Sequence, residues 1–316
     1  MTVSIIVAVR GDNPYLRECI EHCLRLDYTD FEILVLPDRE LTLNYPKTKA
    51  IPTGELTPPQ KRDIGMARAE GEILAFLDDD TYPAKDWLTK ALRHFEDQEI
   101  TAVGGPGVTP ESDTLKQKAS GLVYSSWLMS GQYAYRYIPK KKRFADDLPS
   151  CNFLIRKSVL QELGGFKVKF WPGEDTFLCL KIIKGLKKKI IYDPDVLVYH
   201  HRRSLFKGHL KQIANYAAHR GYFVKRFPET SLKFVYFLPS MLVFGLIIGL
   251  LLSFLNPAFK LIYISAVAIY LALAFILSIS KDFRLTLLVF WGIMLSHLVY
   301  GIYFIKGLFS RRLKEE

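Results

Sequence analysis

Three long uncharged runs toward the C-terminal end constrain most strongly how this chain can fold. They cover residues 234–255, 261–279 and 285–305. Each run is close to the roughly 20 residues that a helix needs to cross a bilayer. A helix in the core of a soluble protein can be equally apolar, but three such runs in succession favour membrane spans. The sequence therefore predicts a polar globular region followed by a transmembrane region.

Charge and cysteine content narrow the class of protein. The 316-residue chain has a formal net charge of +11 at pH 7, and it contains four cysteines without CxxC spacing. A modest positive excess suits anionic lipid headgroups or a phosphorylated substrate. Because no nucleic-acid-binding motif accompanies it, nucleic acid is not a predicted partner. The cysteines are predicted to be reduced thiols of a cytoplasmic domain, and neither a disulfide framework nor a zinc site.

The N-terminal region alternates between strand and helix patterns. Residues 3–9 and 31–36 are apolar runs typical of strands that are buried on both faces. Between them, residues 13–26 form an amphipathic helix pattern, with Asn13 able to cap it and Pro14 suited to its first turn. A β-α-β start implies a parallel sheet with a right-handed crossover. The predicted fold class is therefore α/β.

A third apolar strand pattern, residues 73–77, ends abruptly in the carboxylates Asp78, Asp79 and Asp80. Three neighbouring like charges repel each other unless something positive binds there. In open α/β sheets, ligands bind at the carboxyl ends of the strands. A divalent metal that carries a phosphorylated ligand would explain the triplet. The alternative, capping of the next helix, would explain only Asp80.

An ordered set of motifs between residues 3 and 225 makes the sequence similar to a family 2 glycosyltransferase of the GT-A fold. The motifs are "VSIIVAVR", "EILVLPD", "KRDIGMARAEGEILAFLDDD", "DLPSCNFLIRKSVLQELGGF", "GED" and "HHRRSLFKGHLKQIANYAAHRG". The resemblance implies a Rossmann-like nucleotide-sugar-binding GT-A domain over residues 1–203. An amphipathic interfacial helix or linker (204–230) and transmembrane helices (231–316) would follow.

The resemblance also implies roles for the carboxylate triplet. Asp78 and Asp80 resemble the outer residues of the family's DxD motif, of which the first contacts the sugar nucleotide and the last ligates the metal. His201 would be a further metal ligand. Oxygen ligands suit Mg²⁺ or Mn²⁺, and such a cation would neutralise the charge on the leaving diphosphate. The residues predicted to bind the donor are Ala8, Arg10, Asp38, Lys61, Arg62, Asp78, Asp79 and Arg202.

Several of these assignments have simpler alternatives. Asp38 lies in "LPDRE", where the family more often has "VDDGS", and it could be only a turn residue. Lys61 and Arg62 could equally be the solvated start of a helix. Arg10 occupies a place that relatives often give to Asn or another polar residue.

The "GED" motif contains the predicted catalytic residues, Asp175 and its neighbour Glu174. In an inverting transfer, a base removes the proton of an acceptor hydroxyl as that oxygen attacks the anomeric carbon. Asp175 resembles the family's base, and its apolar surroundings could raise the pKa of a carboxylate. The same three residues could also cap the following helix, and both roles are compatible. Because a phosphate acceptor is already ionised, an acid at this place favours a hydroxyl acceptor.

These patterns together predict an inverting, metal-dependent glycosyltransferase. Gln212 is followed by "IANY", so the QxxRW motif of processive synthases is absent and transfer of a single sugar is predicted. The donor would be a nucleotide-diphosphate sugar and the acceptor a lipid-linked sugar or a cell-surface glycan. One alternative is transfer to a polyprenyl phosphate. Another, from a different class, is a non-catalytic membrane scaffold that keeps a nucleotide-binding domain.

The protein is predicted to cross the membrane several times. Its catalytic domain is predicted to be cytoplasmic, because nucleotide sugars are made in the cytoplasm. Three spans would then place Lys306, Arg311 and Arg312 outside, against the positive-inside tendency. A re-entrant hairpin formed by residues 234–255 would remove the conflict. The sequence leaves both topologies open.

Overall fold

A computed structural model describes residues 1–313, which form two units. We call residues 1–110 and 135–201 the sheet unit, and residues 111–134 and 202–313 the helical unit. The sequence patterns place residues 111–134 in the first domain. The structure groups them with the C-terminal helices instead, because the helix they form packs against the last helix of the chain. Residues 314–316 of the predicted transmembrane region lie outside the described residues.

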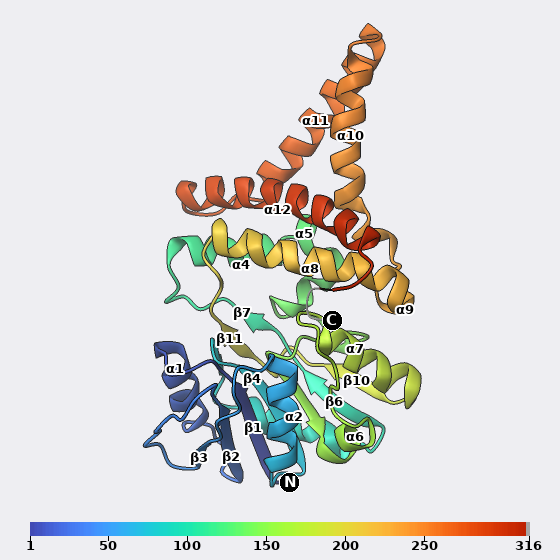
Figure 1. Cartoon of the computed structure of the whole chain (residues 1–316). Helices are drawn as coiled ribbons and strands as arrows, with labels where there is room; N and C mark the ends of the chain where they lie inside the picture. The colour runs from blue at the N-terminus through green and yellow to red at the C-terminus, as the bar shows by residue number, and fades with distance from the viewer. Residues whose placement is uncertain (314–316) are drawn as a thin grey trace. The chain divides into compact units, whose positions relative to one another are not determined.

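The sheet unit is built on a large mixed sheet (Figure 1). Its strands are β1 (Val3–Ala8), β2 (Phe31–Leu36), β3 (Thr48–Ala50), β4 (Ile73–Asp78), β6 (Ile100–Gly104), β8 (Arg143–Phe144), β9 (Asn152–Arg156) and β10 (Lys189–Tyr192). In the described chain they are ordered β3-β2-β1-β4-β9-β6-β10-β8. The pairs β3-β2, β2-β1, β1-β4 and β6-β10 are parallel, whereas β9 and β8 pair antiparallel with their neighbours. The predicted parallel β-α-β start is confirmed.

A smaller sheet lies in the same unit, with the order β5-β11-β7. Its strands are β5 (Thr81–Pro83), β7 (Gly107–Val108) and β11 (Val198–His200). Residues 100–108 are thus divided between the two sheets, with β6 in the large one and β7 in the small one. The break falls at Gly105, where a Cβ atom would lie 1.8 Å from the carbonyl oxygen of Val196. Only glycine permits so close an approach of two backbones.

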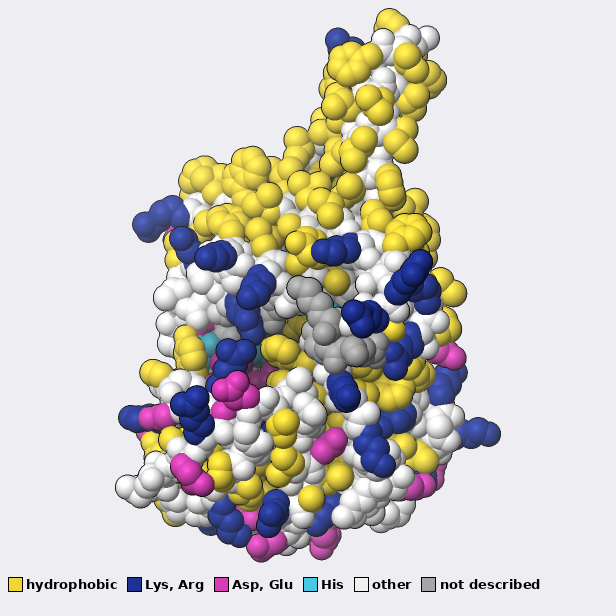
Figure 2. Space-filling model, viewed as in Figure 1, with side chains coloured by type: hydrophobic (Ala, Val, Ile, Leu, Met, Phe, Trp, Pro, Cys, Tyr) yellow, Lys and Arg dark blue, Asp and Glu magenta, His cyan; other side chains and the backbone are white. Residues whose placement is uncertain are grey.

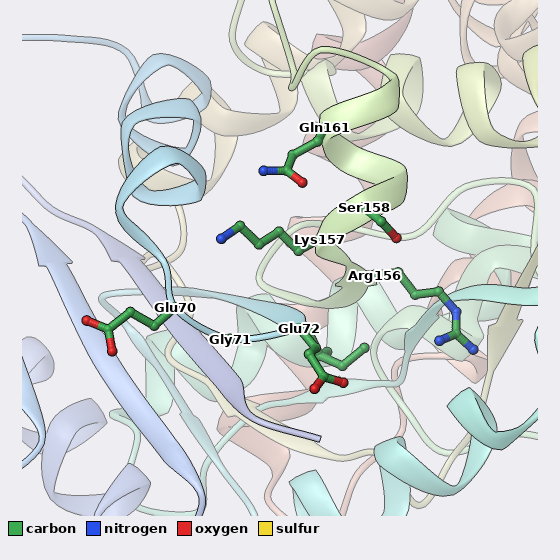
Figure 3. Close-up of a pocket in the computed structure, with 8 residues that line it drawn as sticks. Glu70, Gly71, Glu72, Arg156, Lys157, Ser158 and Gln161 are labelled. Carbon is green, nitrogen blue, oxygen red and sulfur yellow. The ribbon is translucent and has the colours of Figure 1, made fainter.

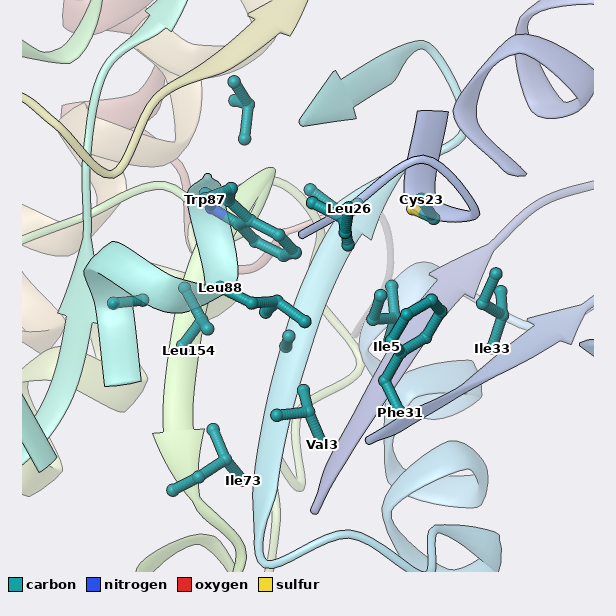
Figure 4. Close-up of a cluster of buried hydrophobic side chains, with 14 of the residues drawn as sticks. Val3, Ile5, Cys23, Leu26, Phe31, Ile33, Ile73, Trp87, Leu88 and Leu154 are labelled. Atoms are coloured by element: carbon teal, nitrogen blue, oxygen red, sulfur yellow. The ribbon is translucent and has the colours of Figure 1, made fainter. Parts of the chain in front are cut away.

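Helices cover both faces of the large sheet. They are α1 (Pro14–Cys23), α2 (Pro58–Arg68), α3 (Trp87–Leu92), α6 (Lys157–Glu162) and α7 (Glu174–Leu180), with the short helices η1 (Arg93–Glu96) and η3 (Lys181–Gly185). On one face, α1 and α3 pack against alternate residues of β1, β2 and β4, and Figure 4 shows this buried cluster. On the other face, Gly65 of α2 packs against Ile6 and Leu36.

The start of α1 follows the predicted chemistry. The side chain of Asn13 accepts a hydrogen bond from the Leu16 amide at 3.0 Å, and Pro14 is the first helical residue. Leu16, Ile20 and Cys23 are buried in the core under this helix. The helix ends at Cys23, three residues before the predicted end.

The helical unit contains the apolar C-terminal segments. Its helices are α4 (Leu115–Ser125), α5 (Trp127–Ser130), α8 (Lys207–Arg226), α9 (Pro228–Ser231), η4 (Phe234–Tyr236), α10 (Leu238–Ser253), α11 (Pro257–Ile276) and α12 (Phe283–Phe309), and η2 (Gly131–Arg136) follows α5. Among residues 1–313, α11 and α12 are long and apolar enough to cross a membrane, by length and composition alone. The remaining predicted segment forms α10, a shorter apolar helix of 16 residues.

Candidate active site

The predicted donor-binding residues begin at one edge of the large sheet. Ala8 ends β1 and Asp78 ends β4, and the two residues are direct partners across the parallel pair. Asp38 follows β2, whose last residue pairs with Ala8. The carboxyl ends of three adjacent parallel strands therefore meet here, as expected for a ligand site in an open α/β sheet.

Asp78, Asp80 and His200 form a candidate metal site. Each can offer one ligand atom, and these atoms lie within 4.8 Å of one another. The Nε2 atom of His200 is 3.2 Å from a carboxylate oxygen of Asp80. Pairing of β5 with β11 produces this contact, because His200 lies directly opposite Thr81, the residue after Asp80. Two carboxylates and an imidazole are a donor set that suits a divalent transition metal.

His201, which was the predicted histidine ligand, lies elsewhere. Its Nε2 atom is 2.8 Å from the carboxylate of Glu18, and its ring packs against Tyr15 of α1 and Tyr82. Consecutive residues of an extended segment point to opposite faces, so the two histidine side chains have different partners, Asp80 and Glu18. The geometry favours His200 as the ligand, whereas the sequence reasoning chose His201 from the same pair of histidines.

The middle carboxylate of the triplet turns toward α1. Asn13, the residue that caps α1, donates a hydrogen bond from its side-chain amide to Asp79 at 2.8 Å. Burial, together with the neighbouring Asp80 carboxylate, raises the pKa of Asp79 to about 6. Asp79 thus anchors the triplet to the helix, and its predicted contact with the donor stays a prediction.

Arg62 joins the two acidic motifs of the sequence. Its guanidinium lies 2.8 Å from Asp78 and 2.7 Å from Glu174. The side chain of Arg62 is buried against Phe166, which follows the glycine turn at the end of α6. Because one buried arginine pairs with both carboxylates, the triplet and the "GED" motif belong to a single site. The prediction of Arg62 as a donor-binding residue remains untested.

Glu174 and Asp175 differ sharply although they are neighbours. Glu174 is 2% exposed and pairs with Arg62. Burial raises the pKa of Glu174, and the charge of Arg62 opposes that shift. Asp175 has no cation within ion-pair distance among residues 1–313. It accepts hydrogen bonds from the amides of Thr176 at 2.7 Å and Ser150 at 3.3 Å.

The environment of Asp175 disfavours its charged form. Burial is the main cause, followed by repulsion from Glu174 and Asp147, and the pKa of Asp175 rises to about 7. The preceding glycine of the motif, Gly173, has φ of +105°, a backbone conformation that suits glycine, and it caps α7. Both roles of the motif are therefore compatible with the geometry, because the turn begins a helix and also presents a carboxylate that is half neutral near pH 7.

The buried Lys61 pairs with the partly buried Asp38, which follows β2. Lys61 forms an ion pair with Asp38, and it also donates hydrogen bonds to the carbonyl oxygens of Val9 and Leu36. These contacts fix Asp38 at the end of β2. Arg10 is exposed, and its carbonyl oxygen accepts a hydrogen bond from the amide of Asp38 at 3.0 Å. The expected roles of these residues toward the donor stay predictions.

Arg202 belongs to the helical unit. Its side chain is buried beside the ring of Tyr124, and its amide donates to Asp113 at 3.2 Å. The predicted contact between Arg202 and the donor remains a prediction.

A shallow pocket of about 410 Å³ lies at the opposite end of β4 (Figure 3). It is lined by Glu70, Glu72, Arg156 and Lys157, among others. The two cations already donate to backbone carbonyl oxygens, Lys157 to Ala69 and Arg156 to Phe95 and Ile100. This pocket therefore does not compete with the carboxyl edge of the sheet as a donor site.

The comparisons with known proteins agree with this fold. The family model for glycosyl transferase family 2 matches residues 4–164, half of the chain. The chain therefore belongs to glycosyl transferase family 2, and the predicted family and enzyme class are confirmed. A pre-mycofactocin glycosyltransferase of Mycobacterium tuberculosis is 27% identical over 178 residues, which are 56% of this chain but only 37% of that protein.

A second relative matches over most of both chains. It is the dolichyl N-acetyl-alpha-D-glucosaminyl phosphate 3-beta-D-2,3-diacetamido-2,3-dideoxy-beta-D-glucuronosyltransferase of Methanococcus voltae, 22% identical over 87% of this chain and 92% of that protein. Among solved structures, the mannosyltransferase PcManGT of Pyrobaculum calidifontis matches with a TM-score of 0.57 and 18% identity. The match covers 98% of this chain and 88% of that one, and it supports the GT-A fold.

Proposed function

We propose that this protein transfers a single sugar, with inversion, from a nucleotide-diphosphate donor to a hydroxyl group of a membrane-associated acceptor. One observation carries the proposal. Asp175 is a carboxylate with a pKa of about 7 and no ion-pair partner in residues 1–313. Through Glu174 and Arg62, it is tied to the Asp78 carboxylate at the donor end of the sheet. A base whose pKa lies near the working pH is the most effective proton acceptor.

In the proposed reaction, Asp175 accepts the proton of the acceptor hydroxyl while that oxygen attacks the anomeric carbon. The anomeric bond to the diphosphate breaks as the new bond forms, so the configuration inverts. The hydrogen bonds from the amides of Ser150 and Thr176 hold the carboxylate in place for this step. Arg62 pairs with the neighbouring Glu174, so Asp175 is the carboxylate of the motif that is left to receive the proton.

We propose that Asp78, Asp80 and His200 hold the divalent cation. When bound there, the cation neutralises the negative charge that develops on the leaving diphosphate. The imidazole nitrogen favours Mn²⁺ over Mg²⁺, since Mg²⁺ prefers oxygen ligands alone. The mannosyltransferase of similar fold from Pyrobaculum calidifontis was solved in complex with GDP-Man and Mn²⁺.

Two observations support a membrane-associated hydroxyl acceptor. The helices α11 and α12 have the length and composition of membrane spans. The Methanococcus voltae relative is named for a lipid-linked sugar phosphate to which it adds a further sugar. Such an acceptor offers a hydroxyl that needs a base, whereas transfer to a polyprenyl phosphate would leave Asp175 without a role.

The test is transfer and donor hydrolysis by the full-length protein purified in detergent. A panel of nucleotide sugars is assayed with Mn²⁺ or Mg²⁺, beside the Asp80→Ala and Asp175→Asn variants. We expect metal-dependent turnover of one donor, lost in both variants, while Asp175→Asn still binds that donor. No metal-dependent donor binding would favour the scaffold alternative. Full activity of Asp175→Asn toward a polyprenyl phosphate would favour the other enzyme reaction.

A further inference from the structure

The apolar helices of the helical unit differ in how much surface they expose. In the most apolar stretch of each helix, 6% of the α11 stretch is buried inside the protein, whereas 39% of the α12 stretch is buried. Large apolar side chains of α10, such as Phe244, Ile248 and Leu251, are likewise exposed. Figure 2 shows hydrophobic side chains covering the surface formed by α10 and α11. Helices that are apolar on all sides match a surrounding of lipid.

In contrast, α12 is bound along one side to α8. The most extensive helix–helix contact in the described chain joins these two helices. A Cβ atom at Gly307 would lie 2.0 Å from the Ala218 carbonyl oxygen, and one at Gly221 would lie 2.1 Å from that of Phe304. The backbones therefore touch, and glycine is required at both places.

Polar contacts hold the two helices together near both ends of α8. His209 lies 2.9 Å from the hydroxyl of Ser296, and Lys225 donates to the carbonyl oxygen of Ser310 at 2.7 Å. These contacts are 16 residues apart on α8, about 24 Å along a helix. Burial, with the charge of Arg202, lowers the pKa of His209 to about 4, so this buried histidine stays neutral.

The charges of α8 determine where α12 can lie. This helix carries several basic side chains, namely Lys207, Lys211, Arg220, Lys225 and Arg226. Such a helix does not enter the hydrocarbon core of a bilayer, because burying charged side chains there is unfavourable. Since α12 is packed along α8, it cannot cross the membrane without breaking that contact. Its composition alone suggested a span, but its packing argues for the membrane surface.

The helices α10 and α11 have the dimensions of a spanning hairpin. They are joined by a short turn and contact each other, and Gly249 lies against the ring of Tyr263. Their 16 and 20 residues correspond to about 24 and 30 Å, close to the ~30 Å hydrocarbon core. From residue 234 to 280 the only charged residue is Lys260, one turn into α11.

We propose that α10 and α11 cross an anionic bilayer as a two-helix hairpin, and that α8 and α12 lie together on the surface from which the hairpin enters. Lys260 then reaches the headgroups of the opposite surface. Lys281, Arg284, Lys306, Arg311 and Arg312 all remain on the entry side. This arrangement satisfies the positive-inside tendency that three spans would violate. The inference rests on the proposed membrane association and is independent of the sugar transfer.

Cysteine labelling of the full-length protein in sealed membrane vesicles tests this topology. All four native cysteines are buried, so single introduced cysteines report their own positions. The variants Ala258→Cys at the tip of the hairpin, Ser280→Cys before α12 and Ser310→Cys after it are treated with a membrane-impermeant maleimide. Right-side-out and inverted vesicles are compared, and detergent-opened vesicles give the full labelling of each site.

We expect Ser280→Cys and Ser310→Cys to label from the same side and Ala258→Cys only from the other. Labelling of Ser280→Cys and Ser310→Cys from opposite sides would mean that α12 spans the membrane, which overturns the proposal. Labelling of Ala258→Cys from the side of Ser280→Cys would show a re-entrant hairpin and also overturn it. Release of the protein by a carbonate wash would refute membrane insertion itself, whereas the donor assay judges the sugar transfer separately.

Discussion

The two acidic motifs of the site contain the same residue types but differ in how their charge is balanced. In the triplet, Asp78 and Asp80 are partly exposed and gather with His200 around one point. In the "GED" motif, Glu174 is neutralised by the buried Arg62, while Asp175 is left without a cation among the described residues. Exposed, converging carboxylates suit a metal, and an enclosed, unpaired carboxylate suits a proton. The positive group near each carboxylate, more than its residue type, therefore distinguishes a proposed metal ligand from a proposed proton acceptor.

The largest expected effect tests the unpaired carboxylate. Asp175→Asn keeps the shape and the acceptor oxygen of the side chain but removes its ability to take a proton. We expect kcat for sugar transfer to fall by about 10³-fold, within the range of general-base catalysis. The affinity for the donor, measured by calorimetry with Mn²⁺, should change little. A variant with near-normal kcat would exclude Asp175 as the base.

The next effect tests the metal side of the comparison. Asp80→Ala removes one carboxylate from the proposed site, and we expect transfer to fall by about 10²-fold or more. Unlike Asp175→Asn, this variant should also lose metal-dependent donor binding. Removal of the metal from the unaltered protein with a chelator should reproduce the loss, and added Mn²⁺ should restore activity there but not in the variant. Equal metal dependence of the two proteins would refute the assignment.

Stability should separate the neighbours Glu174 and Asp175. Glu174→Gln leaves the buried Arg62 with one partner fewer, and we expect it to lower the free energy of unfolding by about 3 kcal/mol. At pH 8, Asp175→Asn should instead raise the free energy of unfolding. Folding raises the pKa of Asp175, so its stabilising contribution is complete at acid pH and is lost as the pH rises through about 7.

The measurement is chemical denaturation of each variant at pH 5 and pH 8. The gain from Asp175→Asn should be largest at pH 8 and clearly smaller at pH 5, where the folded carboxyl is protonated although the unfolded one is already ionised. The loss from Glu174→Gln should be largest at pH 8 and weaker at pH 5, because the raised pKa of Glu174 leaves less of its ion pair with Arg62 at the lower pH. If both variants destabilised the protein equally at pH 8, the contrast between the two carboxylates would not hold.

The two histidines offer a matched pair for the metal site. His200→Ala should weaken the apparent affinity for Mn²⁺ by roughly tenfold or more, because it removes a nitrogen that converges with Asp78 and Asp80. His201→Ala breaks a contact with Glu18 instead, so its effect on Mn²⁺ affinity should be clearly smaller. A Mn²⁺ titration of activity measures both. The reverse ranking would return the metal role to His201.

The last expected effect is on the pH dependence of kcat. Because the base must be deprotonated and the pKa of Asp175 is about 7, kcat should rise with pH by about tenfold per unit below pH 7 and level off above it. The residual activity of Asp175→Asn should lack this rise. A flat profile in the unaltered protein between pH 5.5 and 8 would contradict the proposed protonation state.

Local patterns in the sequence already contain much of this site. Runs such as residues 31–36 and 73–77 fix buried strands, because an apolar, β-branched segment must be covered on both faces. Polar residues just beyond those strands then mark the carboxyl edge of a parallel sheet. The motif order is sufficient to identify the family and the GT-A fold. It also points to the carboxylates Asp78, Asp80 and Asp175 as candidate site residues, and their roles stay predictions.

Tertiary structure decided what depends on partners distant along the chain. In the sequence, Arg62 could be only the start of a helix. In the folded protein it pairs with both Asp78 and Glu174, and Glu174 lies 112 residues after Arg62. Pairing of β5 with β11 places the His200 side chain beside the Asp80 carboxylate, and a shift of one residue along a strand would reverse the face. In the same way, the composition of α12 predicts a membrane span, and only its contact with the charged helix α8 argues against one. Counter-charges, strand pairing and helix contacts are long-range, so no local pattern could contain them.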